Sequence, residues 1–337
     1  MKIIKNVSLK PFNTFGISAM AENLCELTSP EDVQEAVEWL GSPSSDVLIL
    51  GGGSNILLTR NISYVLANRI PGFDIIQEDQ SQVLVKAGAG MNWHQFVLKS
   101  LELGFGGVEN LSLIPGNVGA SPMQNIGAYG VEIKDVFHEL EAIDRITGES
   151  VVFDNPSCEF GYRESVFKNR YKDRFVITSV TYRLSKENKV NTSYGAIEQE
   201  LEKMRISSPG IKDVSRAVIN IRTSKLPDPA KTGNAGSFFK NPEITVVKYD
   251  ALKRSFPDLP GYSVSNDQVK VPAAWLIEQC GWKGFRRGDA GCHERQPLVL
   301  VNFGNAAAKD ILDLSNEIIR SVEDKFGIVL NREVNIV

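Results

Sequence analysis

The 28 glycines of this 337-residue chain restrict its fold more than any other feature, because they gather in a few short regions. These regions are residues 51–53, 88–90, 104–130 and 233–236. Glycine has no Cβ, so neighbouring glycines let the backbone turn sharply or approach another group closely. The clustering therefore predicts several places where main chain, rather than side chains, faces a turn or a ligand.

Between the glycine regions we expect short strands and a few well-marked helices. Residues 30–40 are predicted to form a helix, since Ser29 can cap it, Pro30 suits its first turn and Gly41 can end it. Apolar periodicity predicts further helices over residues 93–101, 196–205, 272–280 and 311–326, and strands over residues 47–50, 82–87, 174–184 and 328–337. Residues 224–229 contain two prolines and are predicted to be a linker. Strands and helices do not alternate regularly, which indicates an α+β fold.

Length and charge exclude several classes of protein. The length suggests two domains or three small ones. The net charge of −4 argues against a non-specific nucleic-acid binder, which would carry a basic excess. The apolar runs are far shorter than the roughly 20 residues that cross a bilayer, and residues 1–6 lack the apolar core of a secretory signal. We therefore expect a cytoplasmic protein with neither a membrane nor a nucleic acid as partner. We also expect a monomer, although none of these observations bears on the oligomeric state.

The first glycine stretch, residues 51–55, has the sequence Gly-Gly-Gly-Ser-Asn and lies between two apolar segments. Its backbone N–H groups could approach a pyrophosphate closely, and Ser54 and Asn55 could add side-chain hydrogen bonds. It is not a dinucleotide-binding fingerprint, because Ile56 stands where G-x-G-x-x-G requires its third glycine. A tight hairpin explains the glycines alone equally well.

The second glycine stretch, residues 115–128, is denser and almost free of charge. Small residues and side chains with amide or hydroxyl groups dominate it. This composition favours a buried loop that lies along a large polar ligand and binds it through backbone donors. A rigid structural turn is the alternative.

Arg163 and Ser237 stand out by their neighbours. Arg163 follows Tyr162 in a region rich in aromatic residues, which would desolvate the guanidinium and strengthen its hold on a carboxylate or phosphate. A structural ion pair is the alternative. Ser237 comes between Gly236 and Phe238, so we expect it at a turn. Its surroundings do not match G-x-S-x-G and no histidine lies in a recognisable triad context, which argues against a serine hydrolase.

A metal site is not predicted. Cys292-His293-Glu294 has the composition of a ligand fragment, but it lacks a second pair of ligands elsewhere in the chain.

Together these stretches resemble the UDP-N-acetylenolpyruvoylglucosamine reductases, flavoenzymes of bacterial peptidoglycan precursor synthesis. The resemblance begins at Asn13-Thr14-Phe15-Gly16, includes Tyr162-Arg163-Glu164-Ser165 and ends at Glu333. It implies an FAD-binding fold of the vanillyl-alcohol oxidase (PCMH) type in two subdomains, with a third, α+β domain that binds substrate. The implied domains are residues 1–70 with a strand in 325–337, residues 71–222, and residues 223–324.

The resemblance also implies the ligands and their residues. FAD would be bound non-covalently, since neither glycine stretch contains a histidine or cysteine, and NADPH would be the co-substrate. The residues implied to hold FAD are Gly51, Gly52, Gly53, Ser54, Asn55, Pro115, Gly116, Asn117, Gly119, Ala120, Ser121, Gln124, Asn125, Gly127 and Ala128.

The substrate implied by the resemblance is UDP-N-acetylglucosamine enolpyruvate. The implied catalytic residues are Arg163, Ser237 and Glu333, with Glu333 protonated in the complex. Residues 190–205 resemble the extra segment of the tyrosine-loop type of this family. Tyr194 would cover the UDP pyrophosphate, and Lys225 and Asn241 would contact the nucleotide sugar. A flavin oxidase that uses oxygen and a non-catalytic nucleotide-sugar binding protein remain as alternatives.

Overall fold

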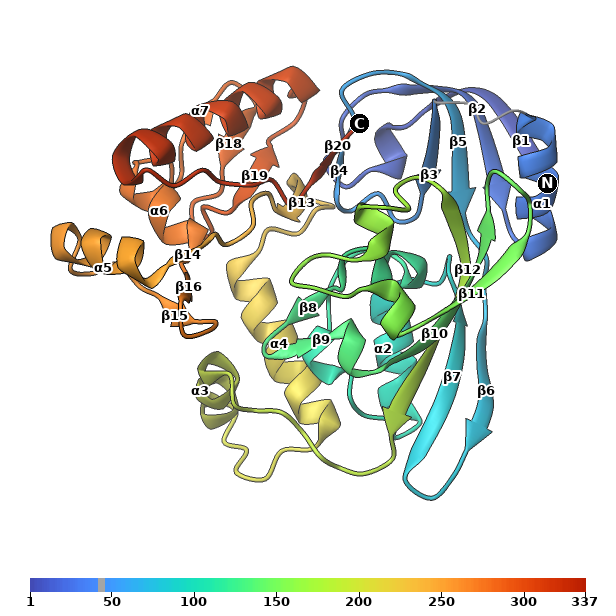
Figure 1. The fold of residues 1–337 in the computed structure, drawn as a ribbon, viewed down its shortest axis with the longest axis horizontal. Helices are drawn as coiled ribbons and strands as arrows, with labels where there is room; N and C mark the ends of the chain where they lie inside the picture. The colour runs from blue at the N-terminus through green and yellow to red at the C-terminus, as the bar shows by residue number, and fades with distance from the viewer. Residues whose placement is uncertain (42–45) are drawn as a thin grey trace. The chain divides into compact units, whose positions relative to one another are not determined.

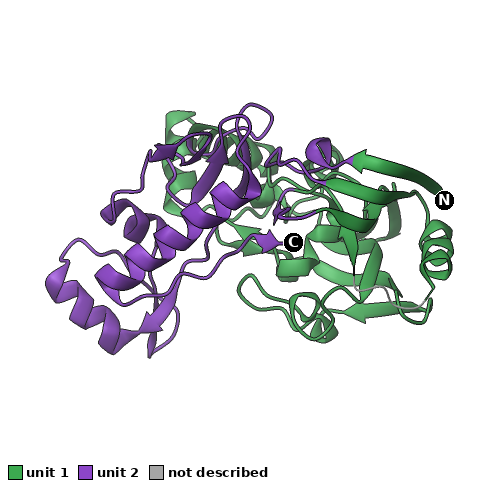
Figure 2. Cartoon of the chain, turned by 90° about the horizontal axis from the view of Figure 1, so that it is seen from above, with its two compact units in different colours: residues 1–7, 20–53, 61–224 green, residues 8–19, 54–60, 225–337 purple. Residues whose placement is uncertain are grey.

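The computed structural model describes residues 1–41 and 46–337 of the chain (Figure 1). Its contacts group into two compact units, coloured separately in Figure 2. Unit 1 comprises Met1–Val7, Met20–Gly53 and Asn61–Ser224, and unit 2 comprises Ser8–Ala19, Ser54–Arg60 and Lys225–Val337. The chain passes between the units several times. The division into three domains, residues 1–70 with 325–337, 71–222 and 223–324, stays a prediction.

The first sheet of unit 1 has the strand order β1-β2-β5-β3. Its strands are β1 (Lys2–Ser8), β2 (Met20–Leu27), β3 (Val47–Leu50) and β5 (Ile62–Asn68), with β5 parallel to both β2 and β3. Helix α1 (Pro30–Leu40) covers it and begins as predicted, since the Ser29 side chain accepts a hydrogen bond from the Asp32 N–H. Val33 and Ala36 are fully buried in the core that α1 shares with β2 and β5.

The second sheet of unit 1 is antiparallel, with the order β11-β10-β12-β7-β6. Its strands are β6 (Phe73–Glu78), β7 (Gln82–Gly88), β10 (Phe137–Asp144), β11 (Ser150–Asp154) and β12 (Phe175–Ser185). Helix α2 (Trp93–Glu102) packs on it through Trp93 and Phe96, whose ring centroids lie 5.7 Å and 4.7 Å from that of Tyr182. The predicted strand 82–87 and the helix after Asn92 are confirmed.

Helices α3 (Gly195–Lys203) and α4 (Ile211–Lys225) form a small core of their own in unit 1. Residues 224–229 were predicted to be a linker, but Ser224 and Lys225 form the last turn of α4. The prediction was wrong for these two residues, because the prolines at 227 and 229 do not prevent a helix from extending to residue 225, whereas residues 226–229 form neither helix nor strand. Two short strands, β8 (Gly127–Ala128) and β9 (Val131–Glu132), pair with each other in the same unit.

Unit 2 contains a sheet with the order β13-β19-β18-β17, packed against a long helix α7 (Ala308–Phe326). Its strands are β13 (Gly233–Ser237), β17 (Arg286–Arg287), β18 (Ala290–Cys292) and β19 (Val299–Asn302). Helix α6 (Ala273–Gln279) packs on α7. A smaller sheet, β14 (Glu243–Thr245), β16 (Gln268–Lys270) and β15 (Tyr262–Ser263), lies beside helix α5 (Val246–Ser255).

The C-terminal segment, residues 328–337, was predicted to be one strand and is not. Only β20 (Asn335–Ile336) is a strand, and it pairs in parallel with β4 (Ile56–Leu57). Earlier in the segment, Arg332 pairs with Phe239 instead. Because the segment changes partners within a few residues, no continuous ladder can form.

The strands with which β3 and β4 pair also exclude a hairpin at the first glycine stretch. A hairpin would require these two strands to pair with each other. Instead β3 pairs with β5 and β4 pairs with β20. Residues 51–55 therefore connect two different sheets.

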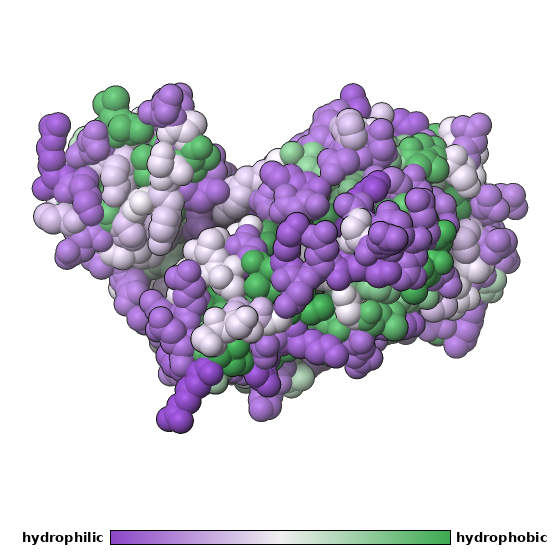
Figure 3. All heavy atoms as spheres, turned by 90° about the horizontal axis from the view of Figure 1, so that it is seen from below, coloured by the Kyte–Doolittle hydropathy of each residue, from purple (hydrophilic) through white to green (hydrophobic). Residues whose placement is uncertain are grey.

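Across residues 1–41 and 46–337, no helix combines the length and the apolar character that crossing a membrane requires. On the face shown in Figure 3, hydrophilic residues cover most of the surface and hydrophobic residues show between them in smaller areas.

Candidate functional site

The two glycine stretches meet in unit 1. A Cβ placed on Gly52 would lie 2.9 Å from the Cα of Gly116, closer than real Cβ atoms come, and 3.1 Å from Oδ1 of Asn117, which is also unusually tight. Gly53 and Gly116 have φ of 61° and 111°, which L side chains rarely adopt. Only glycine allows the two backbones to approach in this way.

The second glycine stretch is fixed to the start of α2. The N–H of Trp93 donates to the carbonyl of Gly116 at 3.0 Å, and the N–H of Val118 donates to the carbonyl of Met91 at 2.8 Å. The N–H of Gly119 donates to the carbonyl of Ala89 at 2.9 Å, and a Cβ on Gly119 would lie 2.6 Å from the Cβ of Ala89. The loop is therefore held rigidly by backbone hydrogen bonds.

Two polar side chains of this stretch are already occupied within the protein. The Asn125 amide donates to Glu132 Oε2 and to the carbonyl of Gly161, both at 3.0 Å, and its Oδ1 accepts from the N–H of Lys134. The Ser121 hydroxyl lies 2.7 Å from that of Tyr182 and is buried. Because these side chains already form hydrogen bonds within the protein, any contact of Ser121 and Asn125 with a ligand would come mainly from their main-chain atoms.

The arrangement of the glycine stretches fits a phosphate-bearing cofactor such as FAD. Among the described residues the N–H groups of Gly52 and Gly116 donate to no protein acceptor. Gly52 lies directly against the backbone of Gly116, with the Asn117 side chain beside it. Backbone donors in a concave turn are a common way to bind a pyrophosphate. Gly51 belongs to the same region, since its carbonyl accepts from Arg69 Nη1 at 3.2 Å.

Ser54 and Asn55, the last two residues of the first glycine stretch, belong to unit 2. Asn55 contacts the C-terminal segment there. Its Nδ2 donates to the carbonyl of Glu333 at 3.3 Å, and its own carbonyl accepts from Asn335 Nδ2 at 3.0 Å. Asn55 is thereby tied to the residue predicted to be catalytic.

Arg163 lies at the far end of the second glycine stretch. Its Nη2 donates to the carbonyl of Gly127 at 2.6 Å, and its guanidinium lies 5.6 Å from the ring centroid of Tyr162. Its φ of 54° is unusual for a residue with a side chain. A Cβ on Gly127 would lie 3.1 Å from Nη1 of Arg163, so the glycine leaves room for the guanidinium.

A second arginine near Arg163 was missed by the sequence analysis. Arg222 on α4 donates from Nε to the carbonyl of Leu113 at 3.2 Å and interacts electrostatically with Tyr129. Burial lowers the pKa of Arg222, Tyr129 opposes that shift, and the charge of Arg163 adds to it. An arginine stays protonated in proteins even so. The helical spacing of the apolar residues around Arg222 could have predicted the helix that carries it.

Tyr129 and Tyr194 form an edge-to-face pair, here called the tyrosine pair. Their ring centroids lie 5.3 Å apart with an interplanar angle of 88°. Tyr129 is partly buried, whereas Tyr194 is 50% exposed and immediately precedes α3. The predicted tyrosine loop therefore lies over Tyr129, next to Arg222.

Ser237 and Glu333 are brought together within unit 2. Ser237 was predicted at a turn, but it is the last residue of β13, where the pairing with β19 has a bulge after Asn234. Gly236, with φ of 70°, allows this irregularity. The N–H of Glu333 donates to the carbonyl of Phe238 at 2.8 Å, which holds the C-terminal segment beside Ser237.

Each of the two other residues predicted to bind substrate lies at a helix end or bonds to one. Lys225 is the last residue of α4 and is exposed. Asn241 lies just before β14, and its Oδ1 accepts a 2.9 Å hydrogen bond from the N–H of Ala273, the first residue of α6.

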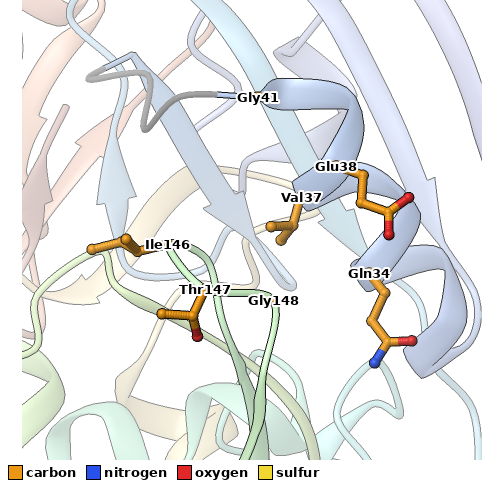
Figure 4. A pocket seen from close by; sticks show the side chains of 7 residues that line it. All are labelled: Gln34, Val37, Glu38, Gly41, Ile146, Thr147 and Gly148. Atoms are coloured by element: carbon orange, nitrogen blue, oxygen red, sulfur yellow. The ribbon is translucent and has the colours of Figure 1, made fainter.

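A surface pocket between α1 and the turn that joins β10 to β11 is a separate feature of unit 1 (Figure 4). It is lined by Gln34, Val37, Glu38, Gly41, Ile146, Thr147 and Gly148. It contains no predicted site residue, and its one charged side chain is a carboxylate. A phosphate-bearing ligand would be repelled there.

The fragment Cys292-His293-Glu294 is used locally. The Cys292 thiol donates to the carbonyl of Pro297, and His293 Nδ1 accepts from the N–H of Gln296 at 3.2 Å. Across the described part of the chain, no group of three or more histidine, cysteine or acidic side chains is arranged to hold a metal ion.

Comparison with known proteins identifies the class first. The family model described as "FAD binding domain" matches residues 21–154, which include both glycine stretches. 6-Hydroxy-D-nicotine oxidase from Arthrobacter nicotinovorans has a similar fold, with a TM-score of 0.50 and 13% identity over 98% of this chain and 86% of that one. The chain is thus an FAD-containing oxidoreductase with the α+β FAD-binding fold of the vanillyl-alcohol oxidase type, as predicted.

The family follows from the remaining comparisons. The model of the C-terminal domain of UDP-N-acetylenolpyruvoylglucosamine reductase matches residues 228–337. Reductases of that name from Flavobacterium johnsoniae and Pseudomonas syringae are 52% and 48% identical, the first over the full length of both chains and the second over all of this chain and 99% of the relative. The Thermus caldophilus reductase has a TM-score of 0.68 at 23% identity, over 100% of this chain and 99% of that one. The chain belongs to the UDP-N-acetylenolpyruvoylglucosamine reductase family, which confirms the predicted resemblance.

Proposed function

We propose that this chain reduces UDP-N-acetylglucosamine enolpyruvate to UDP-N-acetylmuramate with NADPH as reductant, in the synthesis of peptidoglycan precursors. The observation that carries the proposal is the meeting of Gly52 with Gly116, two glycines whose free N–H groups suit a pyrophosphate. It lies within the region that matches an FAD-binding domain. We further propose that the protein works as a monomer in the bacterial cytoplasm.

The residues that would hold FAD are the fifteen predicted in the two glycine stretches. Bound FAD would supply the hydride-transfer chemistry that links NADPH to the enol ether of the substrate. The backbone of Gly52 and Gly116 would hold the pyrophosphate, because these two positions offer N–H groups and no side chain. The rigid anchoring of residues 116–119 to the start of α2 would keep that contact in place.

Arg163 would hold the carboxylate of the enolpyruvyl group. Addition of hydride to the terminal carbon leaves negative charge on the neighbouring carbon, from which it delocalises into the carboxylate. A fixed guanidinium stabilises such charge without having to reorganise. The hydrogen bond from Nη2 to the carbonyl of Gly127 and the ring of Tyr162 would fix the orientation of Arg163.

Ser237 would donate the proton that completes the lactyl ether. A serine hydroxyl is a weak acid, so it serves only where a strongly basic carbon centre forms. Glu333 is held beside this serine by the bond from its N–H to the carbonyl of Phe238. We propose that Glu333 is protonated when the substrate carboxylate is bound, because two carboxylates at one site do not both stay ionised.

The nucleotide part of the substrate would be bound by Tyr194, Lys225 and Asn241. Arg222 is a fourth candidate, since it is a cation next to Tyr129 and hence next to the tyrosine pair. A pyrophosphate needs such positive groups close by, and the chain as a whole carries a net charge of −4. The positive groups must therefore be concentrated locally.

The test is a flavin assay on the purified protein without oxygen. We expect a yellow protein whose flavin absorbance is bleached by NADPH and restored by the enolpyruvyl sugar, with UDP-N-acetylmuramate identified by mass spectrometry. A flavin oxidase would instead be restored by oxygen and not by the sugar. A binding protein without catalysis would carry no flavin. Either result would overturn the proposal.

A further inference from the structure

We infer that Asn110 is a positioning residue: its side-chain amide ties the tyrosine loop to the turn that carries Tyr129 and so sets the tyrosine pair in place before substrate binds. The inference rests on the proposed function for its effect on substrate, but its structural part can be tested without any substrate.

Asn110 lies in a short helical turn, Glu109–Leu111, and is 1% exposed. Both of its amide hydrogens are used. Nδ2 donates to the carbonyl of Tyr129 at 2.9 Å and to the carbonyl of Asn191 at 2.9 Å. A single buried side chain therefore joins two segments that are far apart in the sequence.

The backbone conformation of the first segment must be stabilised by contacts with other parts of the chain. Tyr129 has φ of 52°, in the left-handed region that is rare for bulky residues. Such a conformation persists where the surrounding structure holds it. The hydrogen bond to the carbonyl of Tyr129 itself is one such restraint.

The second segment leads directly to Tyr194. Asn191 Oδ1 accepts from both the N–H and the hydroxyl of Ser193, at 3.1 Å and 2.7 Å, so the turn before Tyr194 is ordered around Asn191. The ring of Tyr194 then packs on Tyr129. The two hydrogen bonds of Asn110 and the packing of Tyr194 on Tyr129 thus join the same two segments at two points.

The amide oxygen of Asn110 shows that the side chain stabilises this region only through its N–H donors. Its Oδ1 is buried and has no hydrogen-bond partner among the described residues. Leaving a buried acceptor unpaired has a free-energy cost, so the contribution of this side chain comes from its two N–H donors. An aspartate of the same shape would place oxygens against two carbonyl oxygens, whereas leucine would keep the bulk without donors.

The experiment compares Asn110→Leu and Asn110→Asp with the unsubstituted protein. Hydrogen–deuterium exchange of the peptide spanning residues 190–197 measures the tether directly, in the FAD-loaded protein without substrate. Steady-state kinetics gives KM and kcat for the enolpyruvyl sugar, and calorimetry gives the Kd for UDP-N-acetylmuramate. Asp144→Asn is the control, since Asp144 is also buried in unit 1 but is bonded to Arg174, away from the loop.

We expect faster exchange of residues 190–197 in both variants, with the larger change for Asn110→Asp. We also expect KM and Kd to rise about tenfold or more, while kcat changes less than about threefold, because an interaction that only positions a binding group affects ground and transition states alike. The control should leave exchange, KM and Kd unchanged even where it lowers the melting temperature.

Three results would overturn the inference. Unchanged exchange in both variants would show that Asn110 does not hold the loop, whatever the protein catalyses. Faster exchange with unchanged KM and Kd would show that the tyrosine pair does not prepare the substrate site. Equal changes in the Asp144→Asn protein would show a general loss of stability. Failure of the unsubstituted protein to reduce the sugar would instead reject the proposed function, and the exchange measurement would still decide whether Asn110 is a tether.

Discussion

The main-chain N–H of Glu333 donates a 2.8 Å hydrogen bond to the carbonyl of Phe238, the residue next to Ser237. This bond joins the C-terminal segment to the bulged end of β13. It places the backbone of Glu333 beside that of Ser237, the residue proposed to donate the proton.

Ser237→Ala should slow the oxidation of reduced flavin by the enolpyruvyl sugar by about 10²–10⁴-fold, because the proton donor is lost. Reduction of the flavin by NADPH should be nearly unchanged. Stopped-flow absorbance measures the two half-reactions separately. Ser255→Ala, at the exposed end of α5, is the control and should affect neither. Equal losses in both half-reactions would falsify the assignment of Ser237.

Gly52→Ala should weaken FAD binding about 10–100-fold, since the new Cβ would lie 2.9 Å from the Cα of Gly116 and the backbones would have to separate. Fluorescence titration of the apoprotein with FAD measures the Kd. The matched control is Gly195→Ala, where nothing lies within 4 Å of the added Cβ. If both variants bound FAD as the unsubstituted protein does, the first glycine stretch would not be part of the cofactor site.

Arg163→Lys should lower kcat/KM for the enolpyruvyl sugar by about 10²–10³-fold. Lysine keeps the charge but loses the planar fork that lets Arg163 bond Gly127 and still face a carboxylate. Steady-state kinetics at saturating NADPH measures the effect. Arg170→Lys is the control, because Arg170 is an exposed residue paired with Glu159 at 3.0 Å. Near-normal kcat/KM in Arg163→Lys would mean that a positive charge at this position is sufficient for the reaction and that the planar fork is not needed.

His94 should make folding stability depend on pH. Its Nδ1 accepts a 3.0 Å hydrogen bond from the N–H of Leu113, which requires the neutral ring. Burial, and then the charge of Arg222, lowers the pKa of His94 below the ordinary 6.5. The unfolded chain therefore binds the proton more tightly, so stability is full above pH 6.5 and falls as the pH drops below it.

The measurement for His94 is urea unfolding of the protein and of His94→Asn, from pH 8 to pH 5. Asparagine offers Oδ1 as an acceptor for Leu113 and does not titrate. His293, whose pKa burial also lowers, keeps some pH dependence in both proteins. The slope should therefore be smaller in His94→Asn, and identical slopes would contradict the prediction.

Local signals in the sequence predicted much of the secondary structure. The cap at Ser29 and the apolar face of residues 33–37 predicted α1, and the stripe from Ile311 to Phe326 predicted most of α7. Helix α4 was missed although Val214, Val218 and Ile221 have helical spacing. This segment is polar on average, and the prolines after it favoured the prediction of a linker over that of a helix. The final strand was overestimated because the backbone of the segment pairs with Phe239 at Arg332 and with β4 only from Asn335 onward.

The amino-acid sequence alone determined the family, the α+β class and the positions of glycine, since order and spacing of motifs are properties of the chain. The tertiary structure decided which of those residues meet. That Gly52 lies against Gly116, that Arg222 reaches Tyr129, and that Asn110 bonds both Tyr129 and Asn191 depend on packing between distant segments. No local pattern encodes such contacts, because each becomes favourable only after the surrounding core has brought its partners together.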